Sequence, residues 1–379
     1  MIYLDNSATT FPKPEIVRIG VNESLNKYCA NPGRSGHRMS LSTAKKVFEC
    51  RQSVCKLFNI DDESKVVFTS GCTHALNIVI KGVLKKGDHC VISCLEHNSV
   101  LRPLEKLKSI GVTYSVAKVY PDDNDKTVDS FRNCFNEKTK LVICTHASNV
   151  FGIRLPVERL CALAHSYDIK FCLDAAQSAG VLPINIGEYC YDYVCCAGHK
   201  GLYGPMGIGL LVVTTEKLPD TLIEGGTGSE SQNNNQPDFI PDRFESGTLN
   251  IPGVCGLNSG IEFVLKKGIE TIQAHETKLV KLAYNGLKSL KNAKLYTDTP
   301  SKDKYAPVLS FTVKGKNSED VASYLSSKFN IAVRAGLHCS PLAHKFMGTI
   351  DEGTVRISPS VFSNESHIQR LLYAIKNYN

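Results

Sequence analysis

Short apolar runs alternate with longer amphipathic stretches between residues 65 and 215, and this alternation constrains the fold more than any other feature. The runs are rich in Val, Ile, Cys and Phe, and most lack polar alternation, as is typical of strands buried on both faces. We predict strands at residues 65–70, 89–94, 112–119, 140–146, 169–175, 192–198 and 207–213. Amphipathic stretches such as 73–84 and 157–168 predict helices between them. The order predicts an α/β fold with a doubly wound, mostly parallel seven-stranded sheet.

A second, smaller unit is expected after this sheet. Residues 224–250 are polar and rich in Gly and Asn, which predicts a long loop. Beyond that loop, the pattern predicts helices within 256–292, a strand at 307–315, a helix at 318–329, a strand at 331–336 and a helix at 366–379. Residues 1–12 are expected to pack on this unit, because terminal segments usually need to be tied down. We therefore expect a large α/β domain at 13–255 and a small α+β domain of 1–12 with 256–379.

Composition excludes several classes of protein. The 379 residues are 42% hydrophobic and 21% charged, with a scattered net charge of +7. No apolar run approaches the ~18 residues of a membrane span, and MIYLDNSATT lacks the pattern of a secretory signal. No basic stripe with interleaved aromatic residues indicates nucleic-acid binding. The mild excess of positive charge leaves room for an anionic small ligand.

The 15 cysteines are an odd number and mostly lie in apolar segments, with no C-x-x-C pair among them. A secreted disulfide scaffold would be short and evenly paired, and a structural zinc or iron–sulfur site needs a ligand framework that is missing here. We therefore expect no metal, and mostly buried thiols in a reducing cytoplasm.

Polar residues follow several predicted strands. Because ligands of open α/β sheets bind at the carboxyl ends of the strands, these positions are candidate site residues. SGCTHALN, with Cys72 and Thr73, can hold a phosphate on the backbone N–H groups of a helix start. His97 follows the second predicted strand. Taken alone, each of these residues has an ordinary explanation as a helix cap or a loop residue.

Two later strand ends strengthen the pattern. Asp174 ends an apolar strand, a costly place for a carboxylate without a cationic partner, and Gln177 lies three residues on. His199 and Lys200 lie in the Gly-rich turn AGHKGLYG between two apolar strands. A phosphate cradle, a strand-end Asp and a Gly-flanked Lys, in this order, are what pyridoxal phosphate requires: the Lys forms a Schiff base, and the Asp keeps the pyridine nitrogen protonated.

At this point the sequence resembles a known family, the class V aminotransferase-type, fold-type I pyridoxal-phosphate enzymes, and within it the cysteine desulfurases. The similarity runs essentially from end to end. The motifs that carry it are YLDNSATTFPKP, NPGRSGH, SGCTHALN, EHNS, SNVFG, DAAQSAG, GHKGLYGPMGIG, FESGTLN, RAGLHCSPLAH and GTVRIS. The GHK and RAGLHC segments are the specific ones.

The resemblance implies cofactor contacts. Lys200 would be the Schiff-base lysine, Asp174 would pair with the pyridinium nitrogen, Gln177 would contact the ring hydroxyl and His97 would stack on the ring. The phosphate would be held by three further residues of the same chain, Cys72, Thr73 and His199. Thr248 in FESGTLN would reach the phosphate of a neighbouring subunit, which implies a homodimer with shared sites.

The resemblance also implies substrate contacts and a reaction. Asn149, Arg356 and Ala8 would bind the substrate, and a guanidinium suits a carboxylate because its fork makes two parallel hydrogen bonds. Lys200 would remove the α-proton of L-cysteine. Cys339, which lies beside His338 in a loop that we expect to be exposed, would then take the sulfur as a persulfide and release alanine.

Alternatives remain open at this stage. The same site would suit a selenocysteine lyase, a cysteine sulfinate desulfinase or a true aminotransferase, and a non-catalytic binding module could keep the fold. The short loop around Cys339 resembles the branch whose members often depend on a sulfur-acceptor protein.

Overall fold

The computed structural model describes residues 1–33 and 36–378. Its centre is a seven-stranded sheet in which β8 (Gly209–Val213) alone runs antiparallel to its neighbours β2 and β7. The strands in order across the sheet are β2 (Val66–Thr69), β8, β7 (Tyr193–Ala197), β6 (Lys170–Asp174), β5 (Thr139–Thr145), β3 (His89–Ser93) and β4 (Thr113–Ala117). The predicted α/β class and the mostly parallel seven-stranded sheet are confirmed.

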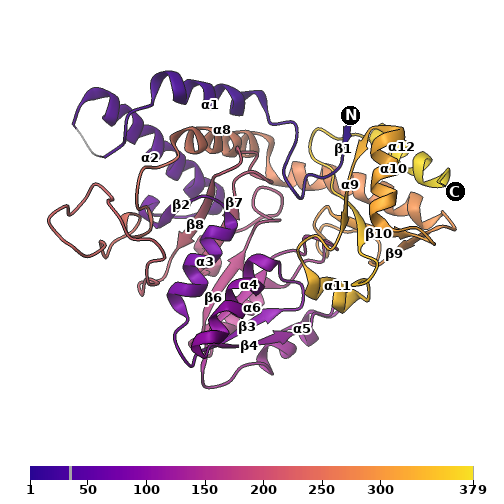
Figure 1. The fold of residues 1–379 in the computed structure, drawn as a ribbon, viewed down its shortest axis with the longest axis horizontal. Coiled ribbons are helices and arrows are strands. Elements are labelled where there is room, and N and C mark those ends of the chain that lie inside the picture. Colours follow the sequence, from indigo (N-terminus) through magenta and orange to yellow (C-terminus); the bar gives the residue numbers. More distant parts are fainter. Residues whose placement is uncertain (34–35, 379) are drawn as a thin grey trace.

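Helices cover both faces of this sheet (Figure 1). The core of one face includes residues of α2 (Arg38–Phe58), α5 (Asn124–Arg132), α6 (Val157–His165), α7 (Ile186–Tyr189) and α8 (Ile251–Lys267). The core of the other face includes α3 (Cys72–Val83) and α4 (Asn98–Leu107). α1 (Glu15–Lys27) packs on α8. Short 3-10 helices lie at Glu63–Lys65, Lys108–Ile110 and Asp242–Phe244. Continuous apolar strands are explained by this double cover.

The C-terminal third forms its own sheet and core (Figure 1). The sheet order is β12 (Arg334–Gly336), β13 (Thr354–Ile357), β10 (Leu309–Val313) and β9 (Ala293–Leu295). The helices of this part are α9 (Ile269–Lys288), α10 (Ser318–Phe329), α11 (Pro341–Met347) and α12 (Glu365–Lys376). β1 (Ile2–Tyr3) pairs in parallel with β11 (Ile331–Ala332), so the N-terminus lies among these C-terminal elements.

Two details differ from the sequence-based expectation. The strand predicted at 331–336 is two short strands in different sheets, since β11 pairs with β1 and β12 pairs with β13. The predicted boundary at residue 255 falls inside α8, which packs on α1 and α2. The division into two domains stays a prediction.

The topology brings the ends of four parallel strands to one edge. β3, β5, β6 and β7 end at Ser93, Thr145, Asp174 and Ala197, and Thr145 pairs with Asp174 in the ladder. Loops that leave this edge carry most of the candidate residues. None of the helices in the described part of the chain is long and apolar enough to cross a membrane.

Candidate active site

A cavity of about 440 Å³ opens at the carboxyl edge of the sheet. It is lined by residues of the large sheet, the N-terminal segment and the C-terminal sheet, so distant parts of the sequence build one site. Among the predicted site residues, those that line it are Ala8, Cys72, Thr73, His97, Asn149, Asp174, Gln177, His199, Lys200 and Arg356. Cys339 and Thr248 are not among its lining residues.

Lys200 and Asp174 bring groups of opposite charge to the lining of the cavity. Lys200 follows β7, and burial, together with the charge of Arg356, lowers the pKa of its amine. Asp174 ends β6 and is 3% exposed, and burial raises the pKa of its carboxyl. Its Oδ1 accepts hydrogen bonds from the Ala176 N–H at 2.9 Å and the Cys72 thiol at 3.4 Å. The amine and the carboxylate therefore face one polar space with few internal partners.

The N-terminus of α3 forms a cradle beside this pair. The helix starts at Cys72 after Gly71, and the first N–H groups of a helix have no partners within it. A Cβ on Gly209 of β8 would lie 2.5 Å from the Gly71 Cα, so only glycine lets the helix start approach the sheet so closely. The buried Nδ1 of His199 has no hydrogen-bond partner among the described residues. These groups form a donor set suited to an anion.

His97 lies at the start of α4, where its ring is the N-cap. Its Nδ1 accepts the Ser99 N–H at 3.1 Å and contacts the Ser99 hydroxyl at 2.7 Å, and that hydroxyl contacts Thr73 at 2.9 Å. Burial and the charge of Lys200 lower the pKa of His97 to about 4, so the ring is neutral at pH 7. Its orientation is thus set by hydrogen bonds and not by charge.

The N-terminal segment crosses the site and holds the turn that carries Lys200. Gln177 donates to the Ser7 carbonyl at 3.1 Å, next to Ala8 in the cavity wall. The carbonyl of His199 accepts from the Thr9 hydroxyl at 3.1 Å and the Lys13 amine at 2.7 Å. Burial lowers the pKa of Lys13 to about 8.

Arg356, on β13, is 1% exposed and presents its guanidinium to the cavity. Its Nη2 pairs with Asp5 at 2.6 Å and its Nη1 donates to the Asn149 carbonyl at 2.9 Å. Its Nε has no partner in the described chain. One part of a buried guanidinium is therefore free for a ligand anion.

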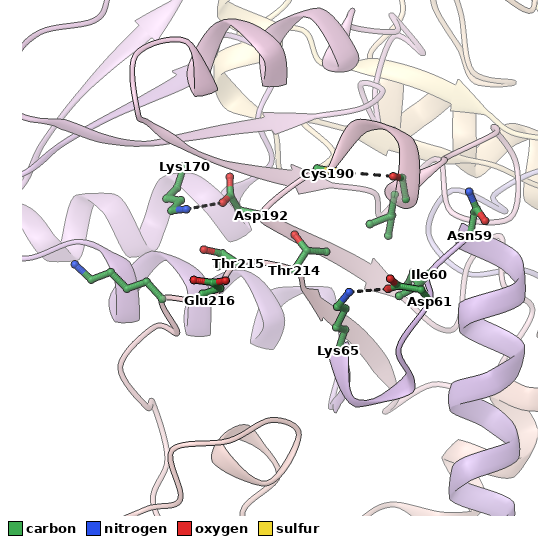
Figure 2. A pocket seen from close by; sticks show the side chains of 13 residues that line it. Asn59, Ile60, Asp61, Lys65, Lys170, Cys190, Asp192, Thr214, Thr215 and Glu216 are labelled. Carbon is green, nitrogen blue, oxygen red and sulfur yellow. Dashed lines mark hydrogen bonds and ion pairs between the residues drawn. The ribbon is translucent and has the colours of Figure 1, made fainter.

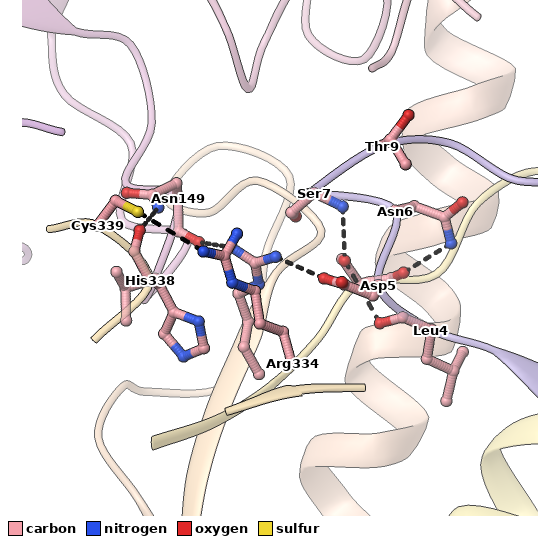
Figure 3. Close-up of polar contacts among 12 residues, drawn as sticks. Leu4, Asp5, Asn6, Ser7, Thr9, Asn149, Arg334, His338 and Cys339 are labelled. Atoms are coloured by element: carbon pink, nitrogen blue, oxygen red, sulfur yellow. Dashed lines mark hydrogen bonds and ion pairs between the residues drawn. The ribbon is translucent and has the colours of Figure 1, made fainter. Parts of the chain in front are cut away.

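Cys339 lies at the rim of this site, in the exposed loop that the sequence predicts. Arg334 lines the cavity, and its Nη2 donates to the Cys339 sulfur at 3.6 Å (Figure 3). The neighbouring His338 is not the cation beside this thiol. Its ring is buried against the Thr354 carbonyl at 3.1 Å, and burial lowers its pKa to about 2.

Thr248 is exposed and contacts the Asn31 amide at 3.4 Å, outside the cavity. In NPGRSGH, Arg34 and Ser35 lie outside the described residues.

Sequence reasoning missed Asp5, Ser99 and Arg334 as site residues. Asp5 and Arg334 lie inside the motifs YLDNSATT and RAGLHC, so their place in these motifs was the available signal. Ser99 carried no such mark, since a serine two residues after a helix cap is ordinary.

A larger hollow of about 750 Å³ lies where β6 and β7 begin, at the opposite edge of the sheet (Figure 2). Two of its lysines already have acidic partners: Lys65 pairs with Asp61 at 2.6 Å and Lys170 with Asp192 at 2.9 Å. The cavity at the carboxyl edge is the better candidate because its charges face open space.

Comparison with known proteins gives a consistent result. The family model for class-V aminotransferases matches residues 2–371. A probable cysteine desulfurase from Methanothermobacter thermautotrophicus is 33% identical over 98% of this chain and 92% of its own length. A cysteine desulfurase from Wigglesworthia glossinidia brevipalpis is 30% identical over 99% of this chain and 92% of its own length.

Solved structures agree. The apo structure of a cysteine desulfurase from Thermococcus onnurineus superposes with a TM-score of 0.91 at 32% identity, over 99% of this chain and 94% of that one. The cysteine desulfurase CsdA from Escherichia coli gives a TM-score of 0.86 at 25% identity, over 98% and 93%. The chain therefore belongs to the class V aminotransferase family, within its cysteine desulfurase branch.

Proposed function

We propose that the chain is a pyridoxal-phosphate-dependent cysteine desulfurase, which converts L-cysteine to L-alanine and leaves the sulfur on Cys339. The observation that carries the proposal is one cavity that holds Lys200, Asp174 and Arg356, with the Cys339 thiol at its rim beside Arg334. An amine, a buried carboxylate, a guanidinium and a thiol are the four groups that this reaction needs.

The residues fit the cofactor. The α3 start, with Cys72 and Thr73, and the unpartnered Nδ1 of His199 would hold its phosphate. Asp174 would hold its ring nitrogen, because both hydrogen bonds that the structure gives this carboxylate use Oδ1. Gln177 and His97 would contact the ring. When bound, the cofactor supplies a carbonyl carbon for a Schiff base and a ring that takes up electrons from the substrate.

The protein's own groups would do the rest. Arg356 would bind the substrate carboxylate through the edge that Asp5 and Asn149 leave free, next to Asn149 and Ala8 in the cavity wall. The lowered pKa of Lys200 makes a neutral amine accessible, which can accept the α-proton.

Sulfur transfer would then balance without an external oxidant. The Cys339 sulfur forms a bond to the substrate sulfur as the substrate carbon–sulfur bond breaks, and the carbon keeps that electron pair and gains a proton. The products are alanine and a Cys339 persulfide. Arg334 would stabilise negative charge on the Cys339 sulfur.

We further propose a homodimer in which Thr248 reaches the neighbouring site. Thr248 is exposed and bonded to Asn31 before α2, and α2 carries Met39, Leu41 and Phe48 as exposed apolar side chains. Such side chains gathered on one helix support a protein interface. The cysteines of the described residues are free thiols, which supports our proposal that the protein works in a reducing cytoplasm.

The test is an assay of alanine and sulfide released from L-cysteine with a reductant, for the wild type and Cys339→Ala, with Cys29→Ala as the matched control because Cys29 is also exposed. We expect Cys339→Ala to lose nearly all alanine release while it keeps the visible absorbance of the bound cofactor. Undiminished alanine release by this variant would refute the role of Cys339. Retained release from selenocysteine alone would favour a lyase.

A further inference from the structure

The segment that carries Cys339 holds two consecutive residues in a conformation that L-amino acids rarely adopt. The φ angles of His338 and Cys339 are +49° and +58°, both in the left-handed region. Non-glycine residues stay in this region only where their surroundings impose it. Contacts of the residues on either side of Cys339 must therefore hold the backbone in this conformation.

The side chain of Asn149 makes those contacts. Its Nδ2 donates to the His338 carbonyl at 2.8 Å, and its Oδ1 accepts from the Ser340 hydroxyl at 2.5 Å (Figure 3 shows the first). Asn149 is 8% exposed and Ser340 is 0% exposed, so water does not compete for these bonds. The Asn149 amide is thus hydrogen-bonded to the residues directly before and after Cys339.

The behaviour of Ser340 is itself informative. It is the N-cap of α11, where a serine hydroxyl usually accepts a hydrogen bond from the first turn of the helix. No such capping bond is present within the described chain, and the hydroxyl donates to Asn149 instead. In addition, the N–H of Asn98 at the start of α4 donates to the Cys339 carbonyl at 2.8 Å. The loop is therefore attached at two points to the loops of the large sheet.

We propose that Asn149 and Ser340 form a clasp that positions the Cys339 sulfur for transfer, an inference that rests on the proposed function. The clasp is separable from substrate binding, because Ser340 does not line the cavity and Arg356 contacts the backbone carbonyl of Asn149, not its side chain. Ser340 is a positioning residue: it touches neither substrate nor cofactor. Removing the Ser340 hydroxyl leaves the lining of the cavity unchanged but breaks the hydrogen bond that holds the Cys339 loop to Asn149.

The experiment compares the Ser340→Ala holoenzyme with wild type. Mass spectrometry would measure how fast the Cys339 persulfide forms from L-cysteine in a single turnover. We expect this rate to fall about tenfold, the effect of one lost buried hydrogen bond. The affinity for L-alanine, measured from the visible absorbance, stays within about twofold, because that ligand does not need Cys339. Amide hydrogen exchange in residues 337–341 becomes about tenfold faster. Ser318→Ala is the matched control, since Ser318 is also a buried serine at the start of a helix, where its hydroxyl donates to the Glu352 carbonyl at 3.0 Å.

Two outcomes would overturn the clasp: an unchanged rate of persulfide formation, or an equal loss of L-alanine affinity, which would place the effect on the substrate site. Failure of the proposed function looks different. The wild type would then form no persulfide on Cys339. In that case hydrogen exchange in residues 337–341 of Ser340→Ala would still test the clasp, and unchanged exchange would refute it.

Discussion

Removal of Asp5 tests the electrostatics of the site directly. Asp5 pairs with Arg356 at 2.6 Å, and the arginine side chain is 1% exposed while that of Asp5 is 19% exposed. Substituting Asp5→Ala leaves a buried guanidinium without its counter-ion, which in buried pairs costs about 3–5 kcal/mol. Because Asp5 is partly exposed and the Asn149 carbonyl still accepts from Arg356, we expect the lower end, about 3 kcal/mol.

The assay is urea unfolding at pH 7. With a denaturant slope of about 3 kcal/mol/M, the midpoint of Asp5→Ala falls by about 1 M. Asp5→Asn keeps an oxygen that accepts from the guanidinium but loses the charge, so its midpoint lies between those of wild type and Asp5→Ala. High salt has little effect on the difference because the pair is buried.

Asp61→Ala is the control because Asp61 pairs with Lys65 at the same distance of 2.6 Å, but its side chain is 86% exposed. An exposed pair of this kind contributes little to stability, so the midpoint of Asp61→Ala stays near that of wild type. Equal midpoints for Asp5→Ala and Asp61→Ala would refute the argument that burial makes the Asp5 pair important.

Two further predictions concern residues directly behind the cavity lining: Glu96 accepts the Thr145 N–H, and Gly209 packs against Gly71. Glu96 is 0% exposed, and burial raises its pKa to about 8, above the unfolded value of about 4.3. Between these two values only the folded state holds the proton, so stability falls as the pH rises from about 4.3 to 8 and levels off above 8. Glu96→Gln removes this pH dependence, so its free energy of unfolding relative to wild type should increase by about 2–3 kcal/mol between pH 6 and pH 8 in urea titrations. A difference that does not change with pH would contradict the raised pKa of Glu96. Gly209→Ala should push the start of α3 away from the sheet, because its Cβ meets the Gly71 backbone, and should weaken cofactor binding at least tenfold in a titration of the apoprotein; unchanged affinity would mean that the cradle tolerates the shift.

The sequence predicted the large sheet well because its strands are buried on both faces. In two of these strands the central residues, 141–144 and 193–197, are apolar throughout, a pattern typical of a doubly covered sheet. The short elements were harder to predict. Residues 331–336 were predicted as one strand. Ile331 in fact pairs with Ile2 and Arg334 pairs with Arg356 in another sheet, and that split depends on partners far away in the chain.

The same contrast holds for the site. Lys200 and Asp174 could be predicted from their places at strand ends, since the topology alone brings such residues together. Asp5 and Ser340 could not, because their importance depends on side chains that fold back on Arg356 and Asn149 from distant segments. Their roles stay predictions until the variants are measured.

The charges around the cavity favour an anionic ligand. Lys200, Arg334 and Arg356 line it, and Asp174 is the only carboxylate among the lining residues of the described chain. Asp5 balances one guanidinium from behind, and the buried histidines add no charge at pH 7. An uncompensated cationic surface is costly to bury, and the phosphate of the proposed cofactor and the carboxylate of the proposed substrate would offset that cost. The mild net charge of the whole chain thus matters less than its concentration at this edge of the sheet.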